Sequence, residues 1–495
     1  MNKLLSTTSF EDYQLFLKAK TLPQYKFCGN NLVIPDEYAS NLFGAKVQPQ
    51  RKLTYRPSDF LFDYQKAIAS IAINKRKFAI FADCGLGKTL IYAEWLRHVR
   101  RLLPKNKAIL WISPLMVIPQ TIRELNKWYN GSLTPKQIRA SELDEWLKEG
   151  GKFGITNFEA MDIDLYRDRI GAIIIDESSM LKSHYGKWGQ AILRLGKGVD
   201  WKLCGTGTPA PNDRIEYANH AVFLDAHPNV NAFLARYFVN KAQTNEKWIL
   251  KPHAIKPFYS GLSHWSIFLV NPATYGWKDH SDDIPPIHVS IHNIPMTSDQ
   301  CLGVQEITGA LTAFGSGGIG QRAKLGQLAK GKYKGKSILT NKPKYIRDLV
   351  STWPTESTII WCIYNDEQTL MEKTFPEAAS ILGSTSYDKR QAVIDSFISG
   401  KTKILITKPK ILGFGLNLQI ATRQVFSGLQ DSYESYYQAV KRSNRVGSTK
   451  PLNVHIPLTD AERPMVLNVL KKAKRVQQDA EAQERIFKEN RYAIE

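Results

Sequence analysis

The chain has 495 residues, of which 43% are hydrophobic and 23% charged, so it is neither disordered nor fibrous and is long enough for two large domains. Lys and Arg number 67 against 46 Asp and Glu, which gives a formal charge of +21. This charge favours a polyanionic partner, with nucleic acid ahead of an acidic membrane surface, although dispersed charge on a soluble protein is the plainer interpretation.

The cysteines and the apolar runs exclude several classes of protein. The cysteines are odd in number, scattered and without a CxxC pair, which argues against a zinc ribbon and suits a reducing compartment. No apolar run is long enough to cross a bilayer, and the first residues do not resemble a signal peptide. We therefore expect a cytoplasmic protein (in the host cytoplasm if phage-encoded) with no membrane partner and no structural zinc. The cysteines are Cys28, Cys84, Cys204, Cys301 and Cys362.

The first strand series follows an N-terminal accessory segment, residues 1–55, whose sequence predicts no particular chemistry. From residue 56 to 222, short β-rich runs alternate with helical patterns. The runs are apolar on both faces, which is typical of parallel strands covered by helices, and the alternation predicts a doubly wound sheet. The predicted strands are residues 77–83, 107–114, 152–158, 171–177 and 201–209.

A second strand series between residues 341 and 460 predicts a second lobe of the same kind. Residues 223–340 are predicted to be a helical insertion or linker, with a flexible glycine run at 315–320. The basic stretch 329–336 is either a clamp on a duplex or, in the plainer interpretation, an exposed linker. Residues 461–495 are predicted to form a charged helical tail. The fold class is therefore α/β, with two doubly wound parallel-sheet lobes and helical insertions between them. The strands of the second series are residues 357–364, 378–383, 402–409, 423–429 and 452–458.

The strongest local signal is a phosphate-binding loop at residues 82–89, with the sequence ADCGLGKT. It follows a predicted strand and opens a helix, so the backbone amides around Gly85, Leu86 and Gly87 can face phosphate oxygens. Lys88 can reach the β- and γ-phosphates, and the Thr89 hydroxyl can ligate Mg²⁺. The loop predicts ATP and Mg²⁺ as cofactors.

Two further elements complete the predicted nucleotide site. Asp176 and Glu177 end an apolar strand, where one carboxylate can hold Mg²⁺ and the other can polarise the attacking water. An ordinary helix cap is the alternative for such a pair. Upstream, Gln65 lies in the sequence FLFDYQ, where its amide can pair with adenine and a nearby aromatic ring can stack on the base. A helix start with a buried aromatic residue explains this sequence as well.

These elements occur in the order in which superfamily two helicases carry their motifs. Residues 82–89, DESS at 176–179 and TGTP at 206–209 resemble motifs I, II and III, while 413–418 and 438–447 resemble motifs V and VI. The GLNL sequence, the QxxxRxxRxG spacing and the long insertion are similar to the Swi-Snf-like branch, and most similar to its compact phage and prophage members. Motif II departs from that branch, which usually has DEAH or DEGH.

The resemblance implies two RecA-like lobes with ATP between them, whose closing and opening move the protein along a strand. Arg442 and Arg445 would stabilise charge on the γ-phosphate, with Gln438 at the matching offset. Their spacing of three predicts that both guanidiniums lie on one helix face, although an isolated RxxR pair is usually a solvated basic helix. Thr206 and Thr208 would couple the ATP site to nucleic acid, and a turn before the following proline explains them equally well.

The resemblance also places nucleic acid across the strand ends of both lobes. Hydroxyls, amides and backbone groups suit contacts with phosphates, which position a duplex without reading its sequence. Each candidate alone is more often a turn or cap residue. The candidates are Ser113, Pro114, Thr156, Asn157, Lys408 and Asn417.

The function predicted from the whole sequence is an ATP-dependent translocase on double-stranded or branched DNA. A strand-separating or branch-migrating helicase of replication or repair is the first alternative. The motor partner of a restriction system is the second, and a binding module whose ATP site no longer turns over is the third. Lys88, Asp176, Glu177 and Arg445 speak against an inactive ATP site.

Overall fold

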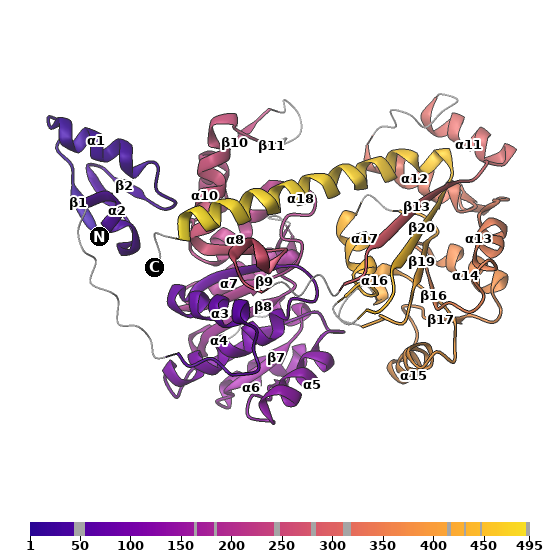
Figure 1. Cartoon of the computed structure of the whole chain (residues 1–495), viewed down its shortest axis with the longest axis horizontal. Coiled ribbons are helices and arrows are strands. Elements are labelled where there is room, and N and C mark those ends of the chain that lie inside the picture. Colours follow the sequence, from indigo (N-terminus) through magenta and orange to yellow (C-terminus); the bar gives the residue numbers. More distant parts are fainter. Residues whose placement is uncertain are drawn as a thin grey trace. The chain divides into compact units, whose positions relative to one another are not determined.

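The computed structural model describes residues 1–43, 55–162, 166–182, 186–241, 248–278, 284–309, 318–412, 417–429, 432–445 and 448–491. The chain forms two compact units, residues 1–279 with 476–495 (unit 1) and residues 280–475 (unit 2). Each unit contains one large parallel sheet covered by helices (Figure 1), so the predicted α/β class with two doubly wound lobes is confirmed. The domain limits drawn from the sequence stay predictions.

The N-terminal segment is a small folded element of unit 1. Its three short strands form an antiparallel sheet in the order β1-β3-β2. Glu37 accepts hydrogen bonds from Lys75 at 2.6 Å, and the Tyr38 hydroxyl lies 2.7 Å from His264 Nδ1, so polar contacts tie this element to the rest of unit 1. The elements are β1 (Asn2–Leu4), α1 (Phe10–Ala19), β2 (Lys26–Cys28), β3 (Asn31–Val33) and α2 (Ala39–Phe43).

The sheet of unit 1 has seven strands, all parallel, in the order β12-β4-β9-β8-β5-β7-β6. The five strands predicted from the sequence lie together in it. The two outermost strands, β12 and β6, were not predicted, and β12 comes from the segment that the sequence assigned to an insertion. The strands are β4 (Lys77–Ala82), β5 (Ala108–Ile112), β6 (Lys136–Gln137), β7 (Phe153–Thr156), β8 (Ile170–Asp176), β9 (Trp201–Gly205) and β12 (Ser266–Leu269).

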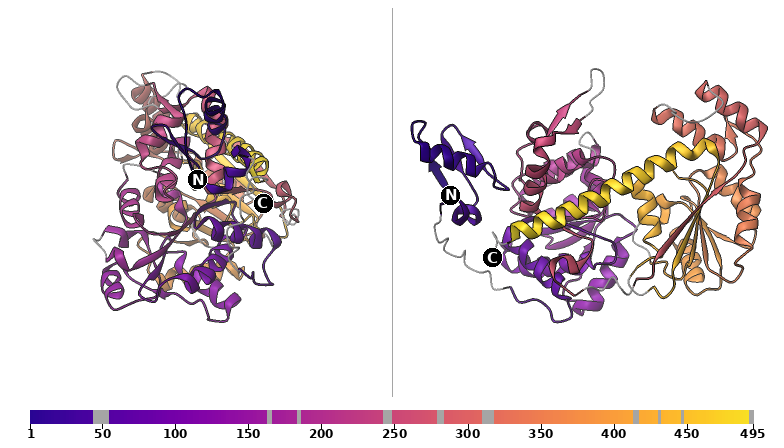
Figure 2. Two further views of the ribbon diagram at one scale, coloured as in Figure 1. Left: turned by 90° about the vertical axis from the view of Figure 1, so that its left-hand side faces the viewer. Right: turned by 45° about the horizontal axis from the view of Figure 1, so that its top comes forward.

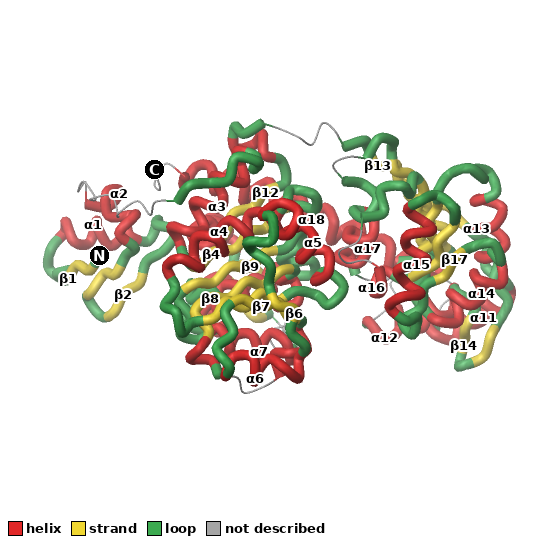
Figure 3. The backbone as a smooth tube through the Cα atoms, turned by 90° about the horizontal axis from the view of Figure 1, so that it is seen from below, coloured by secondary structure: helices red, strands yellow, loops and turns green. Residues whose placement is uncertain are grey.

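Helices cover both faces of this sheet (Figure 3), which explains why its strands are apolar throughout. Along β8, Ile173 and Ile175 enter one core, while Ala172 and Ile174 enter the other. One face packs on α3 (Asp63–Lys75), α4 (Lys88–Leu102) and α5 (Ile118–Tyr129). The other packs on α6 (Leu143–Lys148), α7 (Lys187–Gly196), α8 (Tyr217–Phe223), α9 (Val230–Tyr237) and α10 (Ile255–Trp265). A hairpin of β10 (Phe238–Asn240) and β11 (Trp248–Leu250) follows α9.

The sheet of unit 2 has six parallel strands in the order β13-β20-β19-β16-β18-β17. These strands lie side by side in the orange and yellow part of the right-hand view in Figure 2. Strand β13 was not predicted; it extends the sheet by pairing with β20 along its whole length. Helices α13 and α14 share a core with one face, and α17 contacts the other through the rings of Phe426 and Tyr436. The strands are β13 (Ile287–Asn293), β16 (Thr358–Trp361), β17 (Ala379–Ser380), β18 (Ile404–Thr407), β19 (Arg423–Phe426) and β20 (Leu452–Leu458). The helices are α13 (Lys342–Val350), α14 (Asn365–Thr374), α15 (Tyr387–Ile398), α16 (Pro409–Leu412) and α17 (Tyr433–Val440).

The basic stretch 329–336 is not the exposed linker that the sequence favoured. It ends α12 and continues into a tight hairpin, whose turn residues Lys334 and Gly335 have φ of 47° and 79°. The positive φ at both positions fits a two-residue turn between antiparallel strands. The elements around it are α11 (Ser298–Thr308), α12 (Ile319–Ala329), β14 (Lys332–Tyr333) and β15 (Lys336–Ser337).

A buried ion triad fixes the start of the last helix, α18 (Arg463–Arg491), in unit 2. Glu462 accepts from Lys330 at 2.5 Å and from Lys342 at 2.6 Å, and all three side chains are at most 2% exposed. Burial lowers the pKa of Lys342 to about 8, whereas the charge of Glu462 keeps the pKa of Lys330 raised, so Lys342 is the lysine of the triad that releases its proton more easily. Lys342 also donates to the backbone oxygen of Pro457 at 2.9 Å, which links the triad to β20.

The last part of α18 belongs to unit 1, where a second buried carboxylate holds it. Asp479 accepts from Arg214 Nε at 3.0 Å and from the Tyr259 hydroxyl at 2.8 Å. Further along the helix, Glu484 accepts the backbone N–H of Val270 at 2.7 Å. The next turn places Ile486 in the core on one face of the sheet and Phe487 in the core on the other. Within the described residues, no helix has the length and apolarity needed to cross a membrane.

We predict that Asp479→Ala destabilises unit 1, because it leaves the Arg214 guanidinium without its carboxylate in a largely buried site. The expected loss is about 2–3 kcal/mol, somewhat below that for a fully buried pair, since Arg214 is 28% exposed. Urea unfolding followed by circular dichroism measures it. Lys148→Ala, which breaks the exposed pair with Asp144, serves as the control and leaves stability unchanged within error. Equal midpoints for the two variants would contradict the prediction.

A second prediction concerns pH. Burial lowers the pKa of His227 to about 4, and the nearby Arg236 acts in the same direction. The unfolded chain binds a proton at this histidine near pH 6.5 and the folded chain does not, so stability is complete above pH 6.5 and falls as the pH drops towards 4. The loss at pH 5 is about 2 kcal/mol for this residue. In His227→Leu, the difference in unfolding free energy between pH 7 and pH 5 shrinks by that amount, while the exposed control His253→Leu keeps the wild-type difference.

Candidate active site

Neighbouring strands bring the predicted motifs of unit 1 to one edge of the sheet. Parallel pairing sets Asp176 of β8 beside Gly205 of β9, and Gly205 beside Ile80 of β4. On the other side, Ile175 pairs with Ile112 of β5. The residues that follow these four strands therefore meet at the carboxyl edge, which is where ligands bind in open α/β sheets.

The loop between β4 and α4 has the geometry of a phosphate cradle. Gly85 and Gly87 have φ of 89° and 66°, in the left-handed region that favours glycine. A Cβ on Gly87 would also lie 2.3 Å from Gln65 Nε2, so a side chain there would displace the Gln65 amide. Lys88 opens the helix and donates to the backbone oxygens of Ala82 at 2.8 Å and Asp83 at 3.2 Å, which holds its ammonium beside the loop.

Gln65 packs directly against this loop from α3. Its Oε1 accepts the backbone N–H of Phe62 at 3.0 Å, and its Nε2 donates to the Leu86 oxygen at 3.4 Å. The Tyr64 hydroxyl donates to the same oxygen at 3.2 Å, and the half-exposed Phe62 ring stacks on the Tyr64 ring. An amide and an aromatic ring therefore lie beside the phosphate loop, as an adenine site requires. Adenine recognition by Gln65 stays a prediction.

The two carboxylates at the end of β8 differ in environment. Asp176 is 7% exposed, and its oxygens accept from Ser113 Oγ at 3.3 Å and from the Glu177 backbone N–H at 3.0 Å. Burial, with the neighbouring charge of Glu177, raises the pKa of Asp176 to about 7, against the attraction of Lys88. A buried carboxyl of this kind gains from a bound cation. Asp176 and the half-buried Thr89 supply the hard oxygen ligands that Mg²⁺ prefers.

Thr206 joins the end of β9 to the end of β8. Its hydroxyl donates to Glu177 Oε2 at 3.1 Å and accepts the backbone N–H of Thr208 at 3.2 Å. This approach depends on Gly205, because a Cβ there would lie 2.0 Å from the Tyr92 hydroxyl oxygen and 2.6 Å from a backbone oxygen. Thr206 thus contacts the predicted catalytic carboxylate and Thr208 contacts Thr206, while the coupling role of both stays a prediction.

The nucleic-acid candidates of unit 1 divide into two groups. The side chains of Ser113 and Thr156 are fully buried: Ser113 faces Asp176, and Thr156 donates to the Ile138 oxygen at 2.9 Å. Their hydroxyls are therefore internal, because Ser113 directly follows β5 and Thr156 ends β7, and both strands are covered on both faces. Nucleic-acid contact by these two residues stays a prediction. Pro114 and Asn157, one position later, are half-buried and reach the surface.

The arginines of unit 2 do not lie on a helix face, so that expectation is wrong. Helix α17 ends at Val440, and the chain continues in turns through Arg442 and Arg445. Tertiary hydrogen bonds shape these turns: Gln424 Nε2 donates to Ser443 Oγ at 2.7 Å, and Asn444 Nδ2 donates to a backbone oxygen at 2.7 Å.

The remaining motif residues of unit 2 have varied surroundings. Arg442 and Gln438 are buried, while Arg445 is half-buried. Asn417 is exposed, and its Oδ1 accepts the backbone N–H of Gln419 at 3.2 Å. The rest of the predicted motif V, residues 413–416, and the end of motif VI, residues 446–447, lie outside the described residues.

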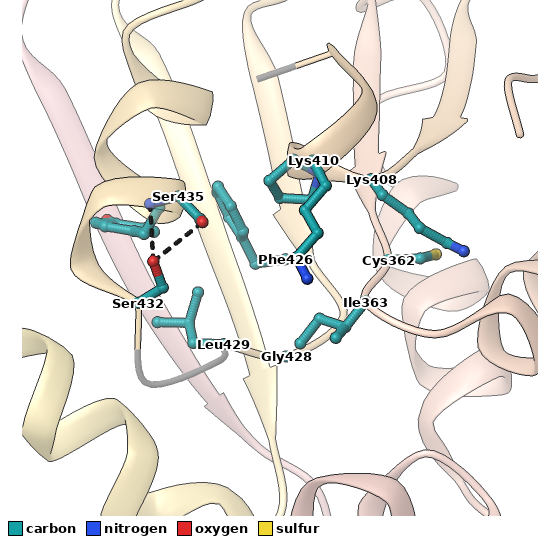
Figure 4. Close-up of a pocket in the computed structure, with 11 residues that line it drawn as sticks. Cys362, Ile363, Lys408, Lys410, Phe426, Gly428, Leu429, Ser432 and Ser435 are labelled. Carbon is teal, nitrogen blue, oxygen red and sulfur yellow. Dashed lines mark hydrogen bonds between the residues drawn. The ribbon is translucent and has the colours of Figure 1, made fainter. Parts of the chain in front are cut away.

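A pocket opens at the carboxyl ends of β16, β18 and β19 in unit 2 (Figure 4). The predicted contact Lys408 lines it and hydrogen-bonds Asn365, and the exposed Lys410 lines the same pocket, together with Phe426 and Tyr436. Lys410 was not predicted from the sequence, although its position two residues after Lys408, just past a predicted strand, was a usable signal. Two ammonium groups thus gather at one edge of this sheet.

Comparison with known families agrees with this geometry. The model of the SNF2-related domain matches residues 64–301, and that of the helicase conserved C-terminal domain matches residues 341–447. The chain belongs to the SNF2-related helicases. The two matches cover the elements that carry the phosphate loop and the carboxylates in unit 1, and the arginine turns in unit 2, up to residue 447.

Individual relatives are distant in sequence. A putative protein, p41, of Acyrthosiphon pisum secondary endosymbiont phage 1 is 23% identical over 79% of this chain and 91% of its own length. The putative ATP-dependent helicase/translocase YwqA of Bacillus subtilis (strain 168) is 23% identical over 89% of this chain, which spans 50% of YwqA. The RAD54-like DNA repair and recombination protein of Homo sapiens is 28% identical over 30% of this chain and 22% of its own length.

Among solved structures, the SWI2/SNF2 ATPase core of Sulfolobus solfataricus in complex with double-stranded DNA covers 88% of this chain and 97% of its own. The TM-score is 0.39 and the sequence identity is 17%.

Proposed function

We propose that this SNF2-related chain is an ATP-dependent translocase that hydrolyses ATP at the carboxyl edge of the unit 1 sheet and moves along duplex DNA. The observation that carries the proposal is the hydrogen-bonded series Ser113, Asp176, Glu177 and Thr206, set beside the loop that presents Lys88. A nucleoside triphosphate with its Mg²⁺ has the charge and the length to contact all of these groups. The names of the relatives YwqA and RAD54-like protein also support the proposal.

In the proposed reaction, the loop amides and Lys88 bind the β- and γ-phosphates, and Gln65 contacts the base. Thr89 and Asp176 would hold Mg²⁺, which when bound neutralises charge on the phosphates. Within the described part of the chain no group of three or more His, Cys, Asp or Glu side chains could hold a metal by itself. This fits an ion that takes one or two protein ligands and completes its shell with water and phosphate oxygens.

Glu177 is the proposed water-orienting residue. Thr206 fixes one of its oxygens, which leaves the other to accept a hydrogen bond from water. From unit 2, the proposal assigns Arg442 and Arg445 to the charge that develops on the γ-phosphate. Because Thr206 directly follows β9 and is the first residue of the turn 206–209, movement of that turn would change the position of the Glu177 carboxylate. This is the proposed link between nucleic-acid contact and hydrolysis.

The proposed DNA contacts use backbone phosphates. Pro114 and Asn157 at the surface of unit 1, and Lys408 and Lys410 in unit 2, lie just after strand ends. The exposed Asn417 lies between α16 and β19. The formal charge of +21 adds a field that favours a polyanion. Such contacts position the motor on any sequence, which suits movement along DNA.

We expect Lys88→Ala to abolish DNA-stimulated ATP hydrolysis, because it removes the ammonium at the phosphate loop. Glu177→Gln should bind ATP and hydrolyse it at least about a hundredfold more slowly, because the amide no longer accepts a proton or orients water as a carboxylate does. Phosphate release with duplex DNA and binding of a fluorescent ATP analogue measure the two effects. Lys105→Ala, an exposed residue at the opposite edge of the sheet, is the control. Normal turnover by Glu177→Gln, or no stimulation of the wild type at low salt by any DNA form, would refute the assignment.

The DNA face of unit 2 gives a separate prediction. Lys410→Ala should weaken duplex binding and reduce the slope of log affinity against log salt by about one, because one phosphate contact releases fewer counterions. Fluorescence anisotropy with a labelled duplex at several salt concentrations measures both quantities. Lys373→Ala is the matched control, since Lys373 is an exposed lysine in the last turn of α14, away from the pocket. If the slopes of Lys410→Ala, Lys373→Ala and the wild type are equal, Lys410 does not contact DNA.

Translocation and strand separation are distinguished by two assays run side by side. Displacement of a third strand from a triplex reports movement along a duplex, and displacement of one strand from a forked duplex reports unwinding. Triplex displacement alone supports the translocase, whereas strand displacement supports a strand-separating or branch-migrating helicase.

A further inference from the structure

The backbone at Glu177 is strained. Its φ of 52° and ψ of 52° lie in the left-handed region, which a residue with a side chain adopts at a cost of about 1–3 kcal/mol. A conformation of this kind persists only where the neighbouring groups hold it in place. The contacts on each side of Glu177 therefore show what keeps the proposed water-orienting carboxylate where it is.

Two of these contacts lie on the strand side and are part of the site described above. Asp176 ends β8 and accepts the Glu177 backbone N–H at 3.0 Å. The Glu177 carboxylate accepts from Thr206 at 3.1 Å. These bonds hold the backbone N–H and the carboxylate of Glu177 in place. They do not determine the direction of the backbone after Glu177.

The contacts on the other side come from α8. The chain leaves Glu177 into a short 3₁₀ turn, Ser178–Leu181. At its start, Ser178 Oγ lies 3.0 Å from Nε2 of His220, and at its end, Asn219 Nδ2 donates to the Leu181 oxygen at 2.6 Å. Adjacent residues of α8 thus hold both ends of the turn. All four residues are at most 1% exposed, so water does not compete for these bonds.

The direction of the Ser178–His220 hydrogen bond follows from the second ring nitrogen. Nδ1 of His220 lies 3.3 Å from the backbone oxygen of Glu216, and a carbonyl oxygen can only accept, so Nδ1 carries the hydrogen. In a neutral ring Nε2 is then the acceptor, and the Ser178 hydroxyl donates to it. Burial lowers the pKa of His220 to about 4, which keeps the ring neutral. The edge-on contact with the Phe81 ring, at 5.3 Å and 90°, fixes the plane of the imidazole.

We propose that His220 is a positioning residue for ATP hydrolysis. By accepting the Ser178 hydroxyl hydrogen, it anchors the first residue after Glu177 and so maintains the left-handed backbone that presents the carboxylate to Thr206 and to water. This inference rests on the proposed function of Glu177. It adds that a histidine more than forty residues away in the sequence sets the geometry of the carboxylate.

The decisive experiment compares substitutions that keep or remove the acceptor at the position of Nε2. His220→Leu keeps an apolar side chain but removes the acceptor, and it lowers DNA-stimulated kcat by about ten- to a hundredfold, with KM for ATP within about threefold of wild type. His220→Gln carries an amide oxygen as many bonds from the backbone as Nε2 and restores kcat to within about threefold. His220→Asn, whose oxygen is one bond shorter, remains as slow as His220→Leu. If His220 only stabilised the fold, kcat would not be high in His220→Gln and low in both His220→Leu and His220→Asn.

Ser178→Ala tests the donor while leaving His220 in place, and it answers the question even if His220→Leu does not fold. It should reduce kcat to the level of His220→Leu, and the double variant should be no slower than either single variant, because both remove the same bond. His227→Leu is the matched control: it replaces a buried histidine of unit 1 whose ring contacts are with Phe233 and Tyr237. It loses stability and keeps the wild-type kcat.

The outcomes separate this inference from the proposed function. If the wild type shows no DNA-stimulated ATPase activity, or if Glu177→Gln turns over normally, the proposed function fails. If Glu177→Gln is inactive while Ser178→Ala, or folded His220→Leu, turns over at the wild-type rate, only the role of His220 is overturned. A slow His220→Gln with the thermal stability of the wild type would also overturn it, because the acceptor would then be irrelevant.

Discussion

The parallel backbone pairing of β4, β9, β8 and β5 is the constraint on which the candidate site depends. Each strand contributes a different motif, and the register between strands decides which motif residues touch. Asp176 lies opposite Gly205, so the next residues, Glu177 and Thr206, come within hydrogen-bonding distance. A shift of the register by one residue would turn every side chain to the other face of the sheet and separate them. The cores on both faces make such a shift costly.

The site contains a buried carboxyl and a strained backbone, and the surrounding sheet holds both in place. Asp176 is a buried carboxyl with a raised pKa, and Glu177 has a left-handed backbone, so both residues are less stable than they would be in an ordinary loop. Rigid strands, the Thr206 hydroxyl and helix α8 hold them in this arrangement. Unit 2 has a comparable arrangement in the Glu462 triad, where one buried carboxylate pairs with two buried lysines just before α18.

Several features of the site could be predicted because they are local. A phosphate loop needs glycines and a lysine at fixed spacing, and an apolar strand that ends in two carboxylates predicts a metal-binding edge. One error was also local in origin. Spacing alone placed Arg442 and Arg445 on one helix face, but hydrogen bonds from Gln424 and Asn444 shape the chain into turns beyond Val440. Ser113 and Thr156 are of a type that suits phosphate contacts, and the structure buries both side chains at the ends of covered strands, while their contact with nucleic acid stays a prediction.

The sequence by itself determined the two α/β lobes, their principal strands and the order of the motifs, because hydrophobic periodicity and turn residues are properties of neighbouring positions. Only the tertiary structure decided that β12 and β13 complete the sheets, since a short strand at an edge has a weak pattern and gains its stability from the strand beside it. It also decided that His220 reaches Ser178. No local pattern predicts that contact, because it depends on how α8 packs against a turn that lies far from it in the chain.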